Sequence, residues 1–176
     1  MLTKSILDKT VATILLVLLS PFLLVITIWL WIGLRENPFF VQVRVGRRGK
    51  PFKILKFKTI GQKPGSRRVK TLFFLRTSHI DELPQLLNVL WGSMSMVGPR
   101  PHIPEHVEQY QSWQRERLSV KPGITCLRQL KNPHKKLEFF QDIEYDIEYV
   151  STRNLKLDFQ ILYQTVGFAL KLILKR

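Results

Sequence analysis

An uninterrupted apolar stretch near the start of the chain constrains the architecture more than any other feature. Thr10 to Leu34 spans 25 residues without one ionisable side chain. At about 1.5 Å per residue, a helix of that length crosses the roughly 30 Å hydrocarbon core of a bilayer. The stretch is too long for the apolar part of a cleaved signal peptide, and no small-residue cleavage site follows it. We therefore expect a helix that enters a membrane.

Two features of this stretch argue against a straight transmembrane helix. Ser20-Pro21 lies near its middle, where proline removes one backbone hydrogen bond and the serine hydroxyl can bond to the carbonyl group left without a partner. Basic residues also flank the stretch on both sides, which favours a cytoplasmic position for both ends. These residues are Lys4, Lys9, Arg35, Arg44, Arg47 and Arg48. A re-entrant helix broken at Ser20-Pro21 satisfies both observations, and a kinked helix that crosses once is the alternative.

The net charge is strongly positive and lies mostly after the apolar stretch. The chain carries 28 Lys+Arg against 13 Asp+Glu, for a formal charge of +15, and the segment from Arg35 to Arg76 holds 13 of the basic residues with a single acid. Anionic phospholipid attracts such a segment by about 1 kcal/mol per basic residue. A phosphorylated substrate is a second candidate partner. A nucleic-acid partner is not expected, because no nucleic-acid motif accompanies the charge.

Residues that commonly bind metals or form disulfides are sparse. The single cysteine, Cys126, excludes an intramolecular disulfide framework and a multi-cysteine zinc site. His102 and His106 are four residues apart, but Pro104 separates them and no third ligand is evident. We expect both histidines at the surface.

The remainder of the chain predicts an α+β, mainly helical domain with one β-hairpin. Residues 39–45 and 51–58 are typical of two strands around the turn Gly46-Arg47-Arg48-Gly49. Residues 60–70 are expected to form a loop and 96–101 an irregular segment. Helices are expected from Ser78, over 104–118, over 136–150 and over 155–176, the last at the membrane interface. We divide the chain into a membrane helix at 1–34 and a cytoplasmic catalytic domain at 35–176.

The adjacent acids Asp81 and Glu82 are the strongest candidates for chemistry. Ser78-x-x-Asp81 precedes a run of leucines and predicts a capping box, which places both carboxylates in the first turn of a helix. A purely structural role is one interpretation, with one carboxylate capping the helix and the other solvated. The other is catalytic, because carboxylates mixed with basic residues such as Arg76 and Arg100 hold a metal ion and a diphosphate together. An ionised aspartate can also attack phosphorus and form an acyl phosphate.

Longer segments of the chain resemble the bacterial sugar transferases, the monotopic phosphoglycosyl transferases that load a sugar phosphate onto a polyprenyl phosphate. The similarity covers nearly the whole chain and includes Ser20-Pro21. The other segments that carry it are 37–59, 75–85, 88–101 with its Gly98-Pro99-Arg100-Pro101, 121–125, 146–150 and Leu157-Asp158. The resemblance implies a re-entrant helix with both ends cytoplasmic, in agreement with the charge argument.

The resemblance also implies a two-step reaction at the cytoplasmic face of a bacterial inner membrane, as the first membrane step of exopolysaccharide or O-antigen assembly. Asp81 would attack the β-phosphate of a UDP-sugar, release UMP and pass the sugar phosphate to undecaprenyl or another polyprenyl phosphate. Glu82 would assist by positioning or proton handling, with Mg²⁺ beside Asp81. Arg100, Arg76 and Lys58 would bind substrate phosphate. Downstream glycosyltransferases are further partners that it implies.

The chain departs from the family pattern after Pro122-Gly123-Ile124-Thr125. Pro133 stands where family members carry an arginine, and Lys58-Thr59-Ile60 replaces the usual Arg-Thr-Met. The cations that could replace the missing arginine are Arg128, Lys131, His134 and Lys135. The departure keeps a second function open, that of a catalytically impaired homologue that binds polyprenyl phosphate or a glycosyltransferase partner.

Overall fold

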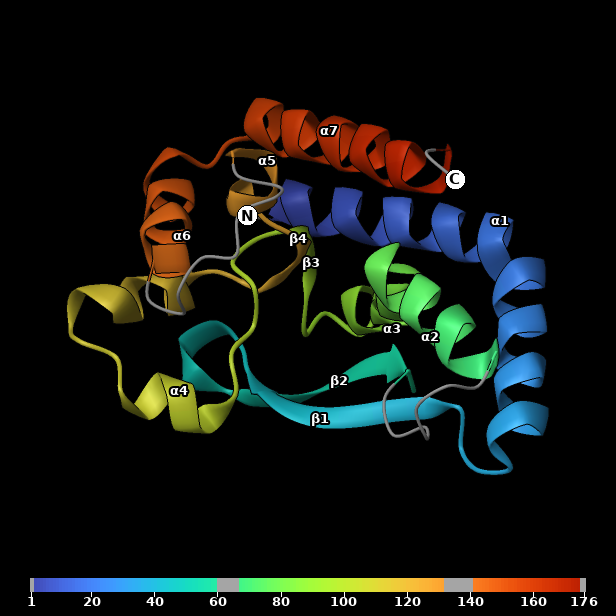
Figure 1. The fold of residues 1–176 in the computed structure, drawn as a ribbon. Coiled ribbons are helices and arrows are strands. Elements are labelled where there is room, and N and C mark those ends of the chain that lie inside the picture. Colours follow the sequence, from blue (N-terminus) through green and yellow to red (C-terminus); the bar gives the residue numbers. More distant parts are fainter. Residues whose placement is uncertain (1, 60–66, 132–140, 175–176) are drawn as a thin grey trace.

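The chain folds into seven helices, three 3₁₀ turns and four strands over the residues that a computed structural model describes, 2–59, 67–131 and 141–174 (Figure 1). The helices are α1 (Leu2–Leu34), α2 (Arg67–Thr77), α3 (Gln85–Leu90), α4 (Pro104–Glu108), α5 (Leu127–Lys131), α6 (Gln141–Thr152) and α7 (Leu155–Leu174). The 3₁₀ turns are η1 (Arg47–Gly49), η2 (Ile80–Glu82) and η3 (Trp113–Ser119). The strands are β1 (Phe39–Val45), β2 (Pro51–Phe57), β3 (Ser95–Val97) and β4 (Gly123–Thr125). The prediction of a mainly helical α+β fold is confirmed.

Helix α1 bends sharply partway along its length, while its α-helical structure continues from Leu2 to Leu34 (Figure 1). Pro21 lies inside the helix and cannot donate to the carbonyl of Val17, four residues earlier. The Ser20 hydroxyl donates to that same carbonyl at 2.8 Å, as the sequence predicts. The predicted break is therefore a bend within one helix, and its re-entrant course in a membrane stays a prediction.

The apolar surface of α1 is largely left uncovered by the rest of the protein. Among the described helices it alone is long and apolar enough to cross a membrane. Its large exposed side chains include Ile14, Val17, Leu18, Phe22, Leu24, Val25, Ile28, Trp31 and Ile32. Ala12, Ile26 and Leu30, in contrast, are buried in two core clusters with side chains from the rest of the chain. This exposed surface supports membrane association, and the buried contacts fix α1 to the domain.

The predicted hairpin is present. β1 and β2 pair antiparallel, with Phe39 opposite Phe57 and Val45 opposite Pro51. The side chain of Asn88, from α3, lies against β2: its Oδ1 accepts a hydrogen bond from the Leu55 amide at 3.0 Å, and its Nδ2 donates to the Lys53 carbonyl at 2.7 Å. One buried side chain thus satisfies backbone groups of β2 and fixes the hairpin against α3.

A second, two-stranded parallel sheet joins β3 to β4 and corrects the prediction that 96–101 is wholly irregular. Its register pairs Ser95 with Gly123 and Val97 with Thr125. The backbones come unusually close just after β3. A Cβ added to Gly98 would lie 2.4 Å from the Lys121 carbonyl oxygen, and one added to Gly123 would lie 2.1 Å from the Gly98 nitrogen. Glycine is required at both positions because any side chain would overlap the facing backbone.

Several predicted helix boundaries are wrong. α2 begins at Arg67 and includes 67–70, which the sequence predicts as loop, while 60–66 lie outside the described residues. No helix begins at Ser78, because its hydroxyl donates back to the Phe74 carbonyl at 2.7 Å and ends α2 instead. The predicted helix over 104–118 is interrupted and forms α4 and η3.

The two C-terminal helices form where the sequence predicts them, apart from 136–140 and 175–176, which lie outside the described residues. α7 lies beside the first half of α1 (Figure 1). It buries Asp158 and Ile161 and exposes Phe159, Tyr163 and Val166. An amphipathic helix of this kind suits the predicted position at a membrane interface, which stays a prediction.

Candidate active site

A tight backbone turn between α2 and α3 places the two acids. His79 adopts a left-handed conformation with φ +58°, and η2 follows at once. The turn directs both Asp81 and Glu82 inward, where the side chains are buried. No side chain caps η2, so the predicted capping box is wrong. The chain buries two adjacent carboxylates, which is costly unless something compensates for their charge.

Glu82 is compensated by two basic side chains from different elements. Its Oε1 accepts hydrogen bonds from Lys56 Nζ, at the end of β2, and from Arg100 Nη2, in the loop after β3, both at 2.7 Å. Burial opposes ionisation of Glu82, but the charges of Arg100 and Lys56 outweigh it and lower the pKa of Glu82 to about 2. Glu82 is therefore an anion near neutral pH that holds two cations together, and it is poorly suited to proton transfer.

Asp81 differs from its neighbour in having no hydrogen bond or ion pair with any other described residue. Burial, followed by the negative charge of Glu82, raises the pKa of Asp81 to about 6, although Lys56, Arg100 and Arg76 oppose this shift. A carboxylate with a raised pKa and no bonded cation keeps its lone pairs available. At neutral pH Asp81 is mostly ionised and is the better nucleophile of the two acids.

A third basic side chain, Arg44 of β1, joins this group. Arg44, Lys56, Glu82 and Arg100 line one hollow of about 260 Å³ with Gln85. Burial and the charge of Arg100 lower the pKa of Arg44, and its buried Nε atom has no hydrogen-bond partner in the described part of the chain. Three cations around one ionised glutamate leave excess positive charge. Such a site favours an anionic ligand that brings several oxygen acceptors, for example a diphosphate.

Two other side chains, Arg76 and Lys58, were predicted to bind substrate phosphate, and neither lines this hollow. Arg76 is exposed at the end of α2, and its charge lowers the pKa of Asp81. Lys58 pairs instead with Glu36 at 2.7 Å near the surface. Lys56 occupies the place beside Glu82, and sequence reasoning missed both it and Arg44. Strand alternation places positions 56 and 58 on the same face, so the sequence alone could have identified Lys56 as an equal candidate.

The cations that could replace the family arginine also lie in different places in the structure. Lys131 pairs with Glu148 at the surface. Arg128 lies nearer the acids: burial lowers the pKa of His79 most, and the charges of Arg100, Lys56 and Arg128 lower it further while Glu82 opposes them. Pro133, His134 and Lys135 lie outside the described residues. Of Arg128 and Lys131, the two candidates that the structure describes, Arg128 is the one whose charge acts on His79 in the acidic turn.

A buried polar network supports the loop that carries Arg100. Arg117 of η3 donates to the Arg100 carbonyl oxygen at 2.6 Å and forms a buried ion pair with Asp146 of α6. His102, which the sequence predicts at the surface, is buried in this network against Arg117 and Tyr110. Burial and the charge of Arg117 lower the pKa of His102 to about 2. A neutral His102 lets Arg117 remain paired with Asp146 and fix the Arg100 backbone.

Comparison with known proteins decides the family. The family described as bacterial sugar transferase matches residues 1–172. The chain belongs to this family. The match includes α1, the acidic turn of Asp81 and Glu82, and α7 as far as residue 172, and it confirms the resemblance seen in the sequence.

Relatives of this sugar transferase are found in several bacteria. It is 38% identical over 184 residues to the UDP-glucose:undecaprenyl-phosphate glucose-1-phosphate transferase of Klebsiella pneumoniae, covering 94% of this chain but 40% of that protein. It is 37% identical over 183 residues to a Caulobacter vibrioides protein of the same name, 68% of which is covered. It is also 38% identical over 175 residues to the uncharacterized sugar transferase EpsL of Bacillus subtilis, covering 86% of that protein. The chain thus spans about two-fifths of the Klebsiella relative.

Proposed function

We propose that this chain transfers a sugar phosphate from a UDP-sugar to undecaprenyl or another polyprenyl phosphate at the cytoplasmic face of a bacterial inner membrane. Family membership and the names of the relatives support the class of reaction. The observation that carries the mechanism is the contrast between the two acids. Glu82 is held by Lys56 and Arg100, while Asp81 has no bonded partner among the described residues.

In the first step, a carboxylate oxygen of Asp81 attacks the β-phosphorus of the UDP-sugar. The bond from that phosphorus to the bridging oxygen breaks, and UMP leaves with the oxygen and its electron pair. The product is an acyl phosphate that joins Asp81 to the sugar phosphate. The raised pKa of Asp81 suits this role, because a more basic carboxylate is a stronger nucleophile once it is ionised.

The basic side chains stabilise the charge that develops on the diphosphate. Arg44, Lys56 and Arg100 line the hollow beside Glu82, and preorganised cations at such a position lower the barrier to phosphoryl transfer. Glu82 acts as a positioning residue, because its carboxylate fixes Lys56 and Arg100 at hydrogen-bond distance. Arg128 is our candidate to replace the family arginine in contacting the substrate phosphate or nucleotide.

In the second step, a phosphate oxygen of the polyprenyl phosphate attacks the same phosphorus. Asp81 leaves as a carboxylate, and the product is a polyprenyl diphosphate sugar. The exposed apolar surface of α1 supports a location at the membrane, where the acceptor presents its phosphate at headgroup depth. No proton needs to be transferred if the acceptor phosphate is a dianion, which agrees with a Glu82 that does not titrate near neutral pH.

The side chains of the site suit an Mg²⁺ ion that binds together with the diphosphate substrate. They suit a metal ion held by the protein alone less well. The described residues contain no group of three or more His, Cys, Asp or Glu side chains able to hold a metal ion. Mg²⁺ usually takes one or two carboxylates together with substrate phosphate oxygens and water. Asp81 would supply the protein ligand. The ion would neutralise diphosphate charge.

Release of UMP from a panel of UDP-sugars tests the proposal. With Mg²⁺ and a polyprenyl phosphate, we expect release by the natural chain from at least one donor, and none by Asp81→Asn. Glu144→Gln, an exposed acid on α6, is the control and should release UMP at the natural rate. Absence of Asp81-dependent release from every donor would refute transfer. It would favour the impaired homologue that the substitution at Pro133 suggests.

A further inference from the structure

A second pocket has no lining residue in common with the hollow beside Glu82, and the proposed reaction does not use it. It lies at the start of α1 and comprises about 490 Å³ of space that is partly open to solvent. Four of its lining residues are basic: Lys4, Arg47, Lys121 and Arg153. They come from four separate segments, namely α1, η1, the segment before β4 and the segment after α6. We call it the N-terminal basic pocket.

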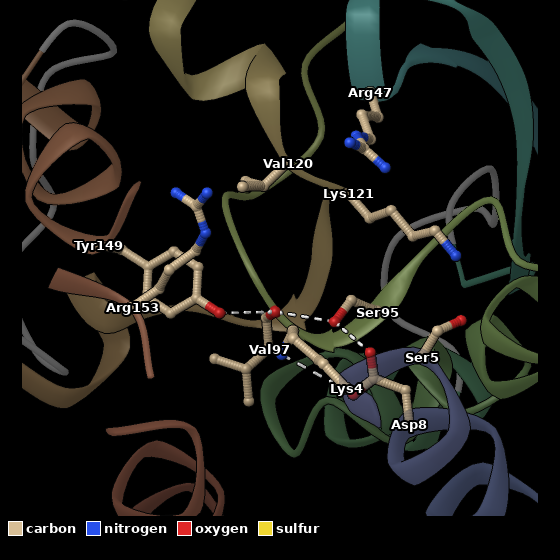
Figure 2. Close-up of a pocket in the computed structure, with 10 residues that line it drawn as sticks. All are labelled: Lys4, Ser5, Asp8, Arg47, Ser95, Val97, Val120, Lys121, Tyr149 and Arg153. Carbon is tan, nitrogen blue, oxygen red and sulfur yellow. Dashed lines mark hydrogen bonds and ion pairs between the residues drawn. The ribbon is translucent and has the colours of Figure 1, made fainter. Parts of the chain in front are cut away.

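The floor of the N-terminal basic pocket is a row of polar groups joined by hydrogen bonds (Figure 2). The Ser95 hydroxyl donates to Asp8 Oδ2 at 2.6 Å, and the Tyr149 hydroxyl lies 3.1 Å from the Val97 carbonyl oxygen. Lys4 Nζ pairs with Asp158 at 2.6 Å and lies 3.9 Å from Asp8. The carboxylates of Asp8 and Asp158 therefore already have bonded partners. The other charged side chains that line the pocket are basic.

The rim of the pocket holds three more basic side chains. Figure 2 shows Arg47, Lys121 and Arg153 around the opening. Within the described part of the chain, Lys121 Nζ has no hydrogen bond or ion pair. Burial, together with the charges of Lys9 and Arg47, lowers the pKa of Lys121 although Asp8 opposes the shift. Like charges held together in this way favour a bound anion, which removes their mutual repulsion.

The position of the pocket indicates the source of that anion. Asp8 is two residues before the apolar stretch of α1, and Arg153 is two residues before α7. Both helices run from this end of the molecule in the same direction (Figure 1), and both expose large apolar side chains further along, such as Ile14, Val17, Phe159 and Tyr163. A lipid whose chains lie along this surface would place its headgroup at the pocket.

We propose that the N-terminal basic pocket binds the phosphate group of an anionic phospholipid and so anchors the start of α1 and α7 at headgroup depth. The pocket shares no lining residue with the hollow beside Glu82, so this role is separate from substrate phosphate binding. The proposal does not depend on catalysis, and its test measures lipid binding alone.

Native mass spectrometry of the full chain in detergent tests the site, with dioleoyl-phosphatidylglycerol and dioleoyl-phosphatidylcholine as probes. We expect one phosphatidylglycerol to remain bound where phosphatidylcholine does not. The double variant Lys121→Gln/Arg153→Gln leaves the Lys4–Asp158 pair intact and should weaken phosphatidylglycerol binding about thirtyfold, given the contribution of two basic residues near an anionic headgroup. Circular dichroism checks that the variant is folded.

The control variant Lys50→Gln/Arg115→Gln removes the same charge from exposed positions outside the pocket and should bind phosphatidylglycerol like the natural chain. Equal weakening in both double variants would overturn the proposal, because binding would then depend only on net charge. Equal retention of the two lipids would overturn it as well. Displacement of the lipid by millimolar inorganic phosphate would assign the pocket to soluble phosphate rather than to a phospholipid.

Discussion

Glu82 receives hydrogen bonds from Lys56 and from Arg100, each at 2.7 Å. Asp81, the adjacent residue, receives none from the described residues. Both acids are buried, yet the pKa of Glu82 falls to about 2 and that of Asp81 rises to about 6. Two neighbouring carboxylates with opposite pKa shifts agree with the division of roles that we propose, in which Glu82 positions the cations and Asp81 is the nucleophile.

Replacement of Asp81 by asparagine should remove activity and stabilise the fold. The folded state raises the pKa of Asp81, so an ionised Asp81 destabilises the protein above that pKa. Asn has nearly the same shape without the charge, and we expect Asp81→Asn to add about 1–2 kcal/mol to the free energy of unfolding at pH 7.5. Urea unfolding in detergent measures this. The difference should vanish below about pH 3, where Asp81 is protonated in both the unfolded and the folded state, and a stability loss at pH 7.5 would contradict the account.

The first step should depend on pH through Asp81. Because its pKa is about 6, the carboxylate is protonated at lower pH and cannot attack phosphorus. The single-turnover rate of UMP release should therefore fall about tenfold for each pH unit below 6 and level off above 7. A rate that stays constant from pH 7 to pH 5 would argue against Asp81 as the nucleophile.

Glu82→Gln should shift this pH dependence downward. The substitution removes the negative charge that raises the pKa of Asp81, and it leaves Lys56 and Arg100 without their anion, so both changes favour the Asp81 carboxylate. We expect the midpoint of the rate profile to move at least about one pH unit lower, with a maximal rate reduced because the cations lose their positions. An unchanged midpoint would show that the two acids are not coupled.

The Arg117–Asp146 pair should matter far more than the surface pair two residues away on α6. Both members of the first pair are almost fully buried, whereas Lys131 and Glu148 are exposed. Asp146→Asn should lower the free energy of unfolding by about 3 kcal/mol, because it leaves a buried guanidinium without its anion. Glu148→Gln is the matched control and should cost less than about 0.5 kcal/mol. Chemical denaturation of the two variants makes the comparison, and equal costs would contradict it.

Features set by neighbouring residues were predictable from the sequence. The hairpin follows from local alternation and turn residues, and the Ser20 hydroxyl reaches the carbonyl that Pro21 leaves free because both lie within one helical turn. The pairing of Ser95 with Gly123 was not predictable, since it joins residues distant in sequence across three-residue strands. Neither was the left-handed backbone of His79, which a non-glycine residue rarely adopts.

The sequence predicted Asp81, Glu82 and Arg100 as members of the candidate site. It missed two of the other cations, Lys56 and Arg44. A local pattern identifies Asp81 and Glu82, but which lysine of β2 meets Glu82 depends on how the hairpin packs against α3. The structure places Lys56 there and pairs Lys58 with Glu36. Arg44 enters the site across the hairpin for the same reason, and His102 is buried because Arg117 and Tyr110 surround it.

Intact-protein mass spectrometry tests the central claim most directly. The full chain is incubated with a UDP-sugar and Mg²⁺ in the absence of polyprenyl phosphate, quenched in acid and weighed, and the modified peptide is mapped. We predict a mass increase of one sugar phosphate located on Asp81, which disappears when polyprenyl phosphate is added. UMP release that requires polyprenyl phosphate and leaves no adduct on the protein would contradict a covalent intermediate at Asp81.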